Sequence, residues 1–185
     1  MDQVEQRQLK KDSRFVKKEG QNLVFTLLSG KKKHLSWSPS ADSETELGYF
    51  YRYYLPKMGY FVVERKDKNK SQYLLINDKS GREKPIWGFP KASPNAKQFI
   101  VGSLEEVSEY ESYGLRIYGF TDQGLKIIWE TTLDETPYFK PILSQWIDDQ
   151  TIQITLQPNS KIPQAKIKLI QLVKDDKGSW LIEEV

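Results

Sequence analysis

The stretch INDKSGREKPIWG, from Ile76 to Gly88, has a counterpart in FTDQGLKIIWE, from Phe120 to Glu130. Each begins with apolar strand residues, continues through an Asp and a Gly, and reaches a Trp after a short polar or mixed stretch. An Asp in such a segment accepts backbone hydrogen bonds inside a tight turn, and the Gly supplies the positive φ that closes the turn. Each stretch therefore predicts a β-hairpin with a Trp on its outgoing strand.

The same hairpin pattern occurs at two further places in the chain. The four predicted turns contain Gly30, Gly81, Gly124 and Gly178, and the Trp residues that follow are Trp37, Trp87, Trp129 and Trp180. Successive glycines lie 51, 43 and 54 residues apart, close to the repeat length of a four-stranded propeller blade, which is about 40 to 50 residues. We expect each glycine to close a turn between neighbouring antiparallel strands. We also expect Trp87 and Trp129 to be largely buried, because a Trp can cover a large apolar area.

Loops that contain proline follow the first three of these Trp residues. They are WSPSADSE (37–44), WGFPKASPNAKQFIV (87–101) and ETPYFKPILSQWIDDQTIQITL (135–156). This punctuation resembles the β-propeller repeat of the TolB type, in which a Ser-Pro-Asp-Gly-like turn opens the first strand of each blade. Here Asn95 and Ala96 replace the Asp-Gly pair. The resemblance implies an all-β, propeller-like array of about four antiparallel blades, the first one partial; a β-sandwich of long hairpins is the alternative. We expect a polar N-terminal arm over residues 1–21, frayed or a short surface helix, and a single all-β repeat domain over residues 22–185.

Composition removes several classes of function. The chain has no Cys and a single His, so it has neither thiol chemistry nor the ligands of a typical zinc site, and His34 is expected in an exposed, lysine-rich turn. We therefore predict no metal and no cofactor. The net charge of +3 in 185 residues gives no reason to expect nucleic acid as a partner.

No apolar run approaches the length of a membrane span, so none is expected. The compartment stays open: it is cytoplasmic if Met1 is the native start, and periplasmic if a signal peptide was removed. The sequence does not determine the oligomeric state.

Two segments are candidates for binding. The first is SLEEVSEYESYG (103–114), which gathers carboxylates in a chain of positive net charge and begins with a predicted short helix; its candidate residues are Glu105, Glu106, Glu109, Tyr110 and Glu111. The second is GYFYRYYLPKMGYF (48–61), the densest aromatic run. Strand alternation places Tyr49, Tyr51 and Tyr53 on one face, with Arg52 on the other. Its candidate binding residues are Tyr51, Arg52 and Tyr53.

Each candidate segment also has a plain structural interpretation: a solvated loop for the first and core packing for the second. We interpret the protein as a non-catalytic, protein-binding module of a bacterium, in the cell envelope or as a toxin-neutralising, immunity-type protein. The predicted partner is another protein with a basic patch. The alternative is a glycan-binding protein or a glycan-acting enzyme that uses the Tyr-rich strand and the Glu-rich loop. We leave enzymatic activity open and favour its absence.

Overall fold

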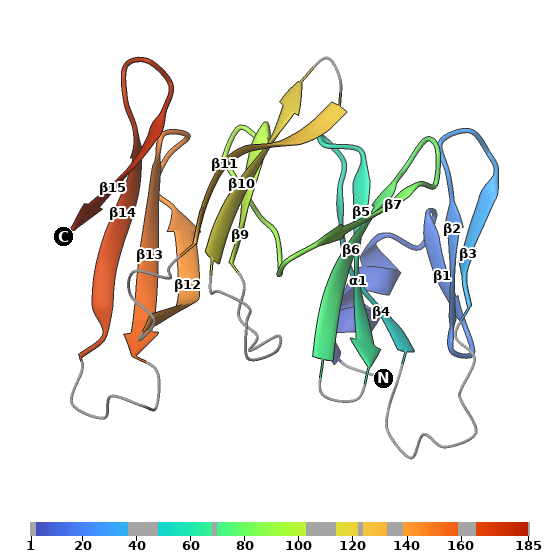
Figure 1. Ribbon diagram of the computed structural model, residues 1–185. Coiled ribbons are helices and arrows are strands. Elements are labelled where there is room, and N and C mark those ends of the chain that lie inside the picture. Colours follow the sequence, from blue (N-terminus) through green and yellow to red (C-terminus); the bar gives the residue numbers. More distant parts are fainter. Residues whose placement is uncertain are drawn as a thin grey trace. The chain divides into compact units, whose positions relative to one another are not determined.

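The computed structural model describes residues 3–36, 48–67, 70–102, 114–121, 124–132, 139–158 and 166–184. Within these ranges the chain is mostly antiparallel β-structure, with one short helix, α1 (Gln3–Lys11) (Figure 1). The predicted all-β class is therefore confirmed. Among the described residues, no helix has the length and apolar character needed to cross a bilayer.

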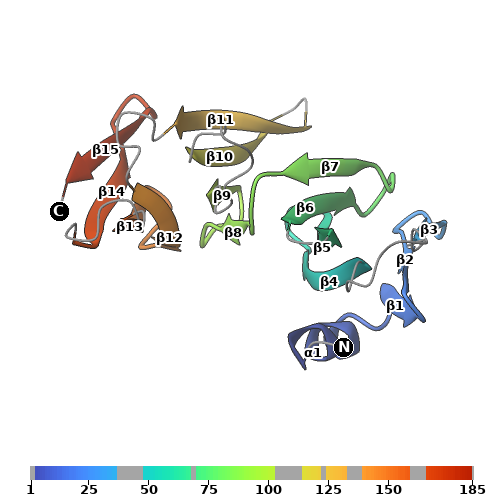
Figure 2. The ribbon, with the colours of Figure 1, turned by 60° about the horizontal axis from the view of Figure 1, so that its bottom comes forward.

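The described strands form four separate sheets, and in each sheet the strands pair in the order in which they occur in the chain (Figure 2). The first sheet has three strands: β1 (Val16–Glu19), β2 (Asn22–Thr26) and β3 (Lys32–Leu35). The second has β4 (Gly48–Leu55), β5 (Tyr60–Asp67), β6 (Lys70–Asn77) and β7 (Glu83–Ile86). The third has β8 (Lys91–Ala92), β9 (Gln98–Gly102), β10 (Gly114–Thr121) and β11 (Gly124–Thr132). The fourth has β12 (Phe139–Trp146), β13 (Thr151–Pro158), β14 (Lys168–Lys174) and β15 (Trp180–Glu184).

The chain divides into two compact units, Met1–Ile86 and Trp87–Val185. Unit 1 holds the first two sheets and α1, and unit 2 holds the third and fourth sheets. In each unit, two sheets contribute alternating apolar residues to a shared core, because the side chains of a strand point to opposite faces in turn. The core of unit 1 comprises Val16, Leu23, Phe25, Leu27, Leu35, Tyr51, Phe61, Val63, Leu74 and Ile76. The core of unit 2 comprises Ile100, Leu115, Ile117, Ile152, Ile154, Leu156, Ile170, Leu172 and Trp180.

The segment expected to be a polar arm contains α1 and β1. Strand β1 pairs with β2, and Val16 on β1 is part of the core of unit 1. Helix α1 contacts β4, the outer strand of the second sheet. Glu5 of α1 is completely buried and accepts a hydrogen bond from the backbone N–H of Tyr51 on β4. The helix therefore covers part of a strand edge that would otherwise leave its backbone groups unpaired.

The glycine turns are confirmed. Gly30, Gly81, Gly124 and Gly178 all have positive φ, between 70° and 95°. Each lies between antiparallel neighbours: β2 and β3, β6 and β7, β10 and β11, and β14 and β15. A residue with a side chain would be strained at such φ, so the sequence pattern and the backbone geometry agree.

The predicted role of Asp in these turns holds at one turn and is wrong at another. Asp175 Oδ1 accepts hydrogen bonds from the backbone N–H groups of Lys177 and Ser179, at 2.9 and 2.7 Å. In the turn around Gly81, however, the acceptor is Asn77, not Asp78. Asp78 is buried and accepts a hydrogen bond from the Tyr54 hydroxyl at 2.7 Å. The residue before Asp78 is the one that faces the turn, so Asp78 is free to point into unit 1.

Two other expectations need correction. His34 is exposed as expected, but it lies on strand β3 and pairs with Val24 instead of sitting in a turn. Trp87 is 37% exposed, so it is not largely buried as expected, whereas Trp129 is partly buried and packs against the core of unit 2. Trp180 is the buried member of the series, at 5% exposed. Trp37 lies outside the described residues.

Candidate functional site

The acidic segment lies outside the described residues, but both residues that bracket it belong to unit 2. Gly102 ends β9 and pairs with Leu115, and Gly114 begins β10 and pairs with Thr132 on β11. Consequently Glu105, Glu106, Glu109, Tyr110 and Glu111 all belong to the connection between two paired strands. The helix predicted over residues 103–110 also lies outside the described part of the chain.

The base of this connection is tightly packed against the segment that enters unit 2. A Cβ added to Gly88 would lie 2.2 Å from the backbone oxygen of Gly102. A Cβ added to Gly114 would lie 2.8 Å from Cζ3 of Trp87 and 2.9 Å from the backbone oxygen of Thr131. Real Cβ atoms do not tolerate such distances, so the backbone at Gly88 and Gly114 can approach its neighbours only because these residues are glycines.

The side chains of Trp87 and Arg116 lie together next to Gly114. The guanidinium carbon of Arg116, on β10, lies 3.0 Å from the ring centroid of Trp87, an approach at which guanidinium and indole attract each other. Arg116 Nε also donates to Glu130 Oε2 at 2.9 Å. Trp87 and Phe89 are each 37% exposed. Trp and Arg at the surface are typical of the residues that dominate the energy of protein–protein interfaces.

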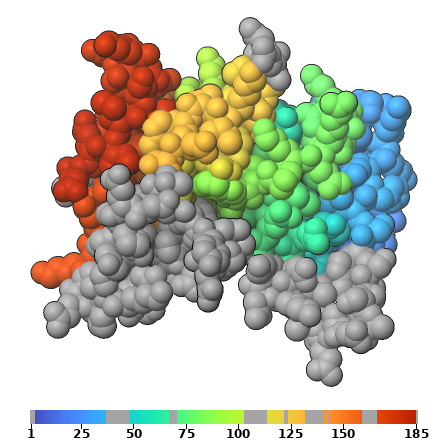
Figure 3. Space-filling view, in the orientation of Figure 1, coloured from blue at the N-terminus to red at the C-terminus, as the bar shows by residue number. Residues whose placement is uncertain are grey.

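The edge strand β11 adds apolar surface to the same unit. Ile127 and Ile128 on this strand are each 42% exposed, and Phe120 at the end of β10 is 36% exposed. The two strands form part of the face seen in Figure 3, where they are coloured yellow. Tyr118 pairs with Ile127 and is buried. Burial raises the pKa of the Tyr118 hydroxyl, and the neighbouring Arg116 only partly opposes this rise.

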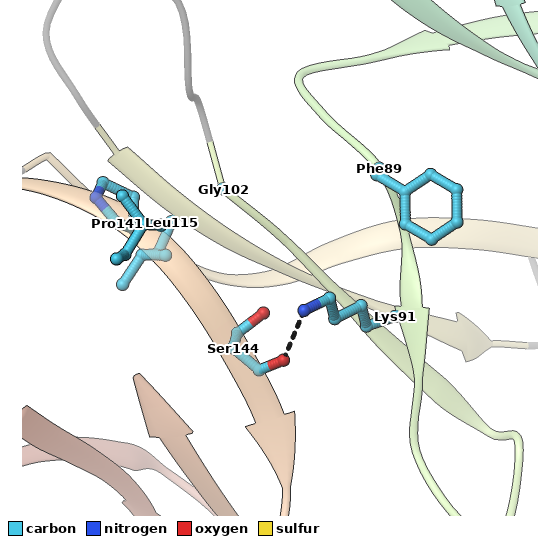
Figure 4. Close-up of a pocket in the computed structure, with 7 residues that line it drawn as sticks. Phe89, Lys91, Gly102, Leu115, Pro141 and Ser144 are labelled. Atoms are coloured by element: carbon cyan, nitrogen blue, oxygen red, sulfur yellow. Dashed lines mark hydrogen bonds between the residues drawn. The ribbon is translucent and has the colours of Figure 1, made fainter. Parts of the chain in front are cut away.

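A small pocket of about 50 Å³ lies next to the first bracketing glycine (Figure 4). Its lining comes from both sheets of unit 2 and comprises Phe89, Lys91, Gly102, Leu115, Pro141, Ile142 and Ser144. Lys91 on β8 donates from Nζ to the backbone oxygen of Ser144 on β12 at 2.7 Å. Trp146 Nε1 donates in return to the backbone oxygen of Lys91 at 2.8 Å. Burial lowers the pKa of the Lys91 ammonium.

The predicted Tyr platform is not formed as alternation suggested. Strand β4 has a β-bulge between Tyr51 and Tyr53, and this irregularity changes the face of the residues that follow. Tyr51 pairs with Val63, a member of the core, whereas Tyr53 pairs with Val62. Tyr53 therefore lies on the opposite face from Tyr51, and Tyr54 takes the place expected for Tyr53 by packing against the core.

The three candidate residues of this strand are engaged within unit 1. Tyr51 is completely buried, and its hydroxyl donates to Asp12 Oδ2 at 2.6 Å. Burial, reinforced by this hydrogen bond, raises the pKa of Tyr51. The Arg52 side chain is only slightly exposed and donates from Nε to Glu64 Oε2 at 2.7 Å. Burial also raises the pKa of Tyr53. These contacts occupy the side chains that a ligand platform would have to present.

The two groups of predicted residues thus belong to different units. The residues missed by sequence reasoning are Trp87, Phe89, Lys91 and Arg116. Three of them alternate in WGFPK, which is a period-two signal for one face of an extended segment. The proline in this run led us to interpret it only as a loop. Among the described residues, no group of three or more acidic, His or Cys side chains is placed to hold a metal ion.

Comparison of the chain with protein-family models, with curated proteins and with solved structures gives no match in any of the three.

Proposed function

We propose that the protein is a non-catalytic protein-binding module that meets its partner at the end of unit 2 where β9 ends at Gly102 and β10 begins at Gly114. The observation that carries this proposal is the exposure of Trp87 and Phe89 beside the glycines that bracket a segment with four glutamates. Exposed aromatic residues supply contact area, and neighbouring carboxylates supply attraction at long range. The proposed partner is a protein with a basic patch.

The architecture supports a binding role without requiring chemistry. Functional loops are commonly carried by a rigid scaffold, and here four antiparallel meanders follow one another along the chain. This order also supports our interpretation of the sheets as blade-like repeats of the TolB type. We propose a bacterial setting, in the cell envelope or in toxin neutralisation. The glycan alternative depended on the Tyr-rich strand, and the burial of Tyr51 removes its main support.

The test separates charge at the acidic segment from charge elsewhere. One variant replaces all four glutamates of the segment with Gln: Glu105, Glu106, Glu109 and Glu111. A control removes the same number of negative charges at exposed positions on other elements: Glu19→Gln, Glu83→Gln, Glu183→Gln and Asp176→Asn. Proteins captured by the wild type are identified by mass spectrometry, and association with the purified partner is then followed by biolayer interferometry.

We expect the segment variant to fold normally and to associate several-fold more slowly than the control variant. The difference should shrink above about 0.15 M salt, where exposed charges are screened within about 8 Å. A Trp87→Ser variant should mainly accelerate dissociation, because short-range contacts act on the lifetime of a complex. Equal association rates of the segment variant and the control at low salt would reject the docking role. Binding to a glycan array instead of a protein would favour the alternative.

A further inference from the structure

The pocket beside Gly102 combines one cation with an apolar lining. In Figure 4 the Lys91 side chain extends from β8 towards Ser144 on β12. Phe89 lies on the segment that leads into β8. Leu115 and Pro141 are buried, whereas Ile142 is 41% exposed and Phe89 is 37% exposed. The buried Leu115 and Pro141 therefore give the pocket an apolar part, and Ile142 and Phe89 face solvent.

The Lys91 ammonium has donors to spare. An ammonium group carries three N–H donors, and in the described part of the chain its acceptor is the backbone oxygen of Ser144. No described carboxylate forms an ion pair with Lys91. A partly buried cation without a counter-ion is disfavoured by desolvation, which agrees with the lowered pKa of Lys91. A carboxylate in the pocket would neutralise this charge and accept the remaining hydrogen bonds.

The size of the pocket limits its occupant. Its volume of about 50 Å³ holds a few atoms, whereas sites for drug-sized ligands are on the order of 300 to 1,000 Å³. A carboxylate with one or two methylene or methyl carbons fits both the volume and the apolar lining. Carboxylates of this size in proteins are the side chains of Asp and Glu and the C-terminal carboxylate.

We propose that the Lys91 pocket is an anchor site for a single carboxylate of the bound protein, an Asp or Glu side chain or a chain terminus. The proposal rests on the proposed binding function and deepens it. The acidic segment attracts a basic patch, and Lys91, which lines the same pocket as Gly102 just before that segment, binds an acid within or next to the patch. Charges of both signs at one interface fix the register of the two proteins and exclude partners with a single sign of charge.

The pocket can be tested on the isolated protein, without knowledge of the partner. N-acetyl-aspartate N-methylamide presents a side-chain carboxylate, and N-acetyl-alanine presents a terminal one. Their neutral counterparts are N-acetyl-asparagine N-methylamide and N-acetyl-alanine amide. Each compound is titrated into ¹⁵N-labelled protein while the amide signals of Gly102 and Leu115 are followed by NMR.

We expect at least one carboxylate probe to shift these signals saturably, with roughly millimolar affinity, because so small a ligand makes few contacts. The neutral counterparts should cause no saturable shift. Lys91→Gln keeps a donor for Ser144 and removes the charge, so affinity should fall tenfold or more. Lys84→Gln is the matched control, because burial also lowers the pKa of Lys84 but Lys84 does not line the pocket.

Which probe binds distinguishes a side chain from a chain terminus, and either result supports the proposal. Equal shifts from carboxylate and amide probes in the wild-type protein would overturn it, and this comparison needs no variant to fold. Retained affinity in Lys91→Gln would overturn it as well. The proposed function stands or falls separately, since the glutamate variant tests partner association and does not alter the pocket lining.

Discussion

Replacement of Glu5 by Gln tests how α1 is held on unit 1. Both carboxylate oxygens of Glu5 accept hydrogen bonds from Lys18 Nζ, at 2.9 and 2.8 Å, and Oε1 also accepts one from the backbone N–H of Tyr51 at 2.9 Å. The Glu5 side chain is 0% exposed and that of Lys18 is 13% exposed. Gln preserves the shape and one acceptor, but it removes the negative charge that both donors face.

The expected loss follows from burial. Removal of one partner from a buried ion pair costs about 3–5 kcal/mol, because the remaining charge stays buried without compensation. The slight exposure of Lys18 lets water reach its ammonium, so we place the loss just below this range, at about 2–3 kcal/mol. This loss corresponds to the value of about one hydrogen bond to a charged group. It is a substantial part of the roughly 5–15 kcal/mol that stabilises a typical domain.

Urea unfolding monitored by tryptophan fluorescence and circular dichroism measures this loss as a change in the free energy of unfolding. Glu19→Gln is the control, because Glu19 is exposed and should change stability by no more than about 0.5 kcal/mol. Lys18→Met and the double variant complete a thermodynamic cycle, in which the two changes should couple strongly. Indistinguishable stabilities of Glu5→Gln and Glu19→Gln would refute the argument that α1 is fastened through this carboxylate.

Three further predictions concern other parts of the two units. Gly88→Ala should destabilise unit 2 by about 1–3 kcal/mol or more in thermal unfolding, because its Cβ would overlap the backbone oxygen of Gly102; a neutral result would mean that the backbone relaxes freely. Burial and a hydrogen bond raise the pKa of Tyr54 to about 12, so its contribution to stability is complete below pH 10 and is lost as pH rises towards 12. Absorbance at 295 nm should show this late ionisation, and Tyr54→Phe should remove it. Asp175→Ala should cost about 1 kcal/mol and Asp176→Ala almost nothing in urea unfolding, since the carboxylate of Asp175 accepts hydrogen bonds from the backbone N–H groups of Lys177 and Ser179 in the described turn; similar losses would contradict that assignment.

Local chemistry made the turns predictable. A glycine in a tight hairpin is required by its own backbone angle, and this requirement depends on a few neighbouring residues only. Gly81 and Gly178 could therefore be assigned without any knowledge of the rest of the fold. The same sequence did not show whether Asn77 or Asp78 faces the turn, because Tyr54, the partner of Asp78, is distant in the chain.

Register and burial were harder to predict for the same reason. Alternation along β4 placed Tyr51 and Tyr53 together, but the bulge between them depends on how β4 pairs with β5. Likewise, Glu5 lies in a polar segment that gives no sign of burial. Its partner Lys18 and the backbone of Tyr51 come close only once the first two sheets of unit 1 are formed. Such contacts require the tertiary structure and leave no periodic signal.

Gly88, Gly102 and Gly114 pack closely against their neighbours next to the acidic segment, and this packing affects how the segment would bind a partner. Loops gain affinity when their ends are fixed, because fewer conformations are lost on binding. Here Gly88 approaches Gly102 closely, and Gly114 approaches the Trp87 ring. Both residues that bracket the acidic segment, Gly102 and Gly114, are therefore held against residues 87–91, which include Phe89 and Lys91. A larger residue at Gly114 would therefore do more than lower stability. It would move Trp87 relative to the acidic segment, so a Gly114→Ala protein that still folds should bind its partner more weakly through faster dissociation, with an association rate close to that of the wild type. An association rate that falls instead would mean that Gly114 acts through the charges of the segment and not through the position of Trp87.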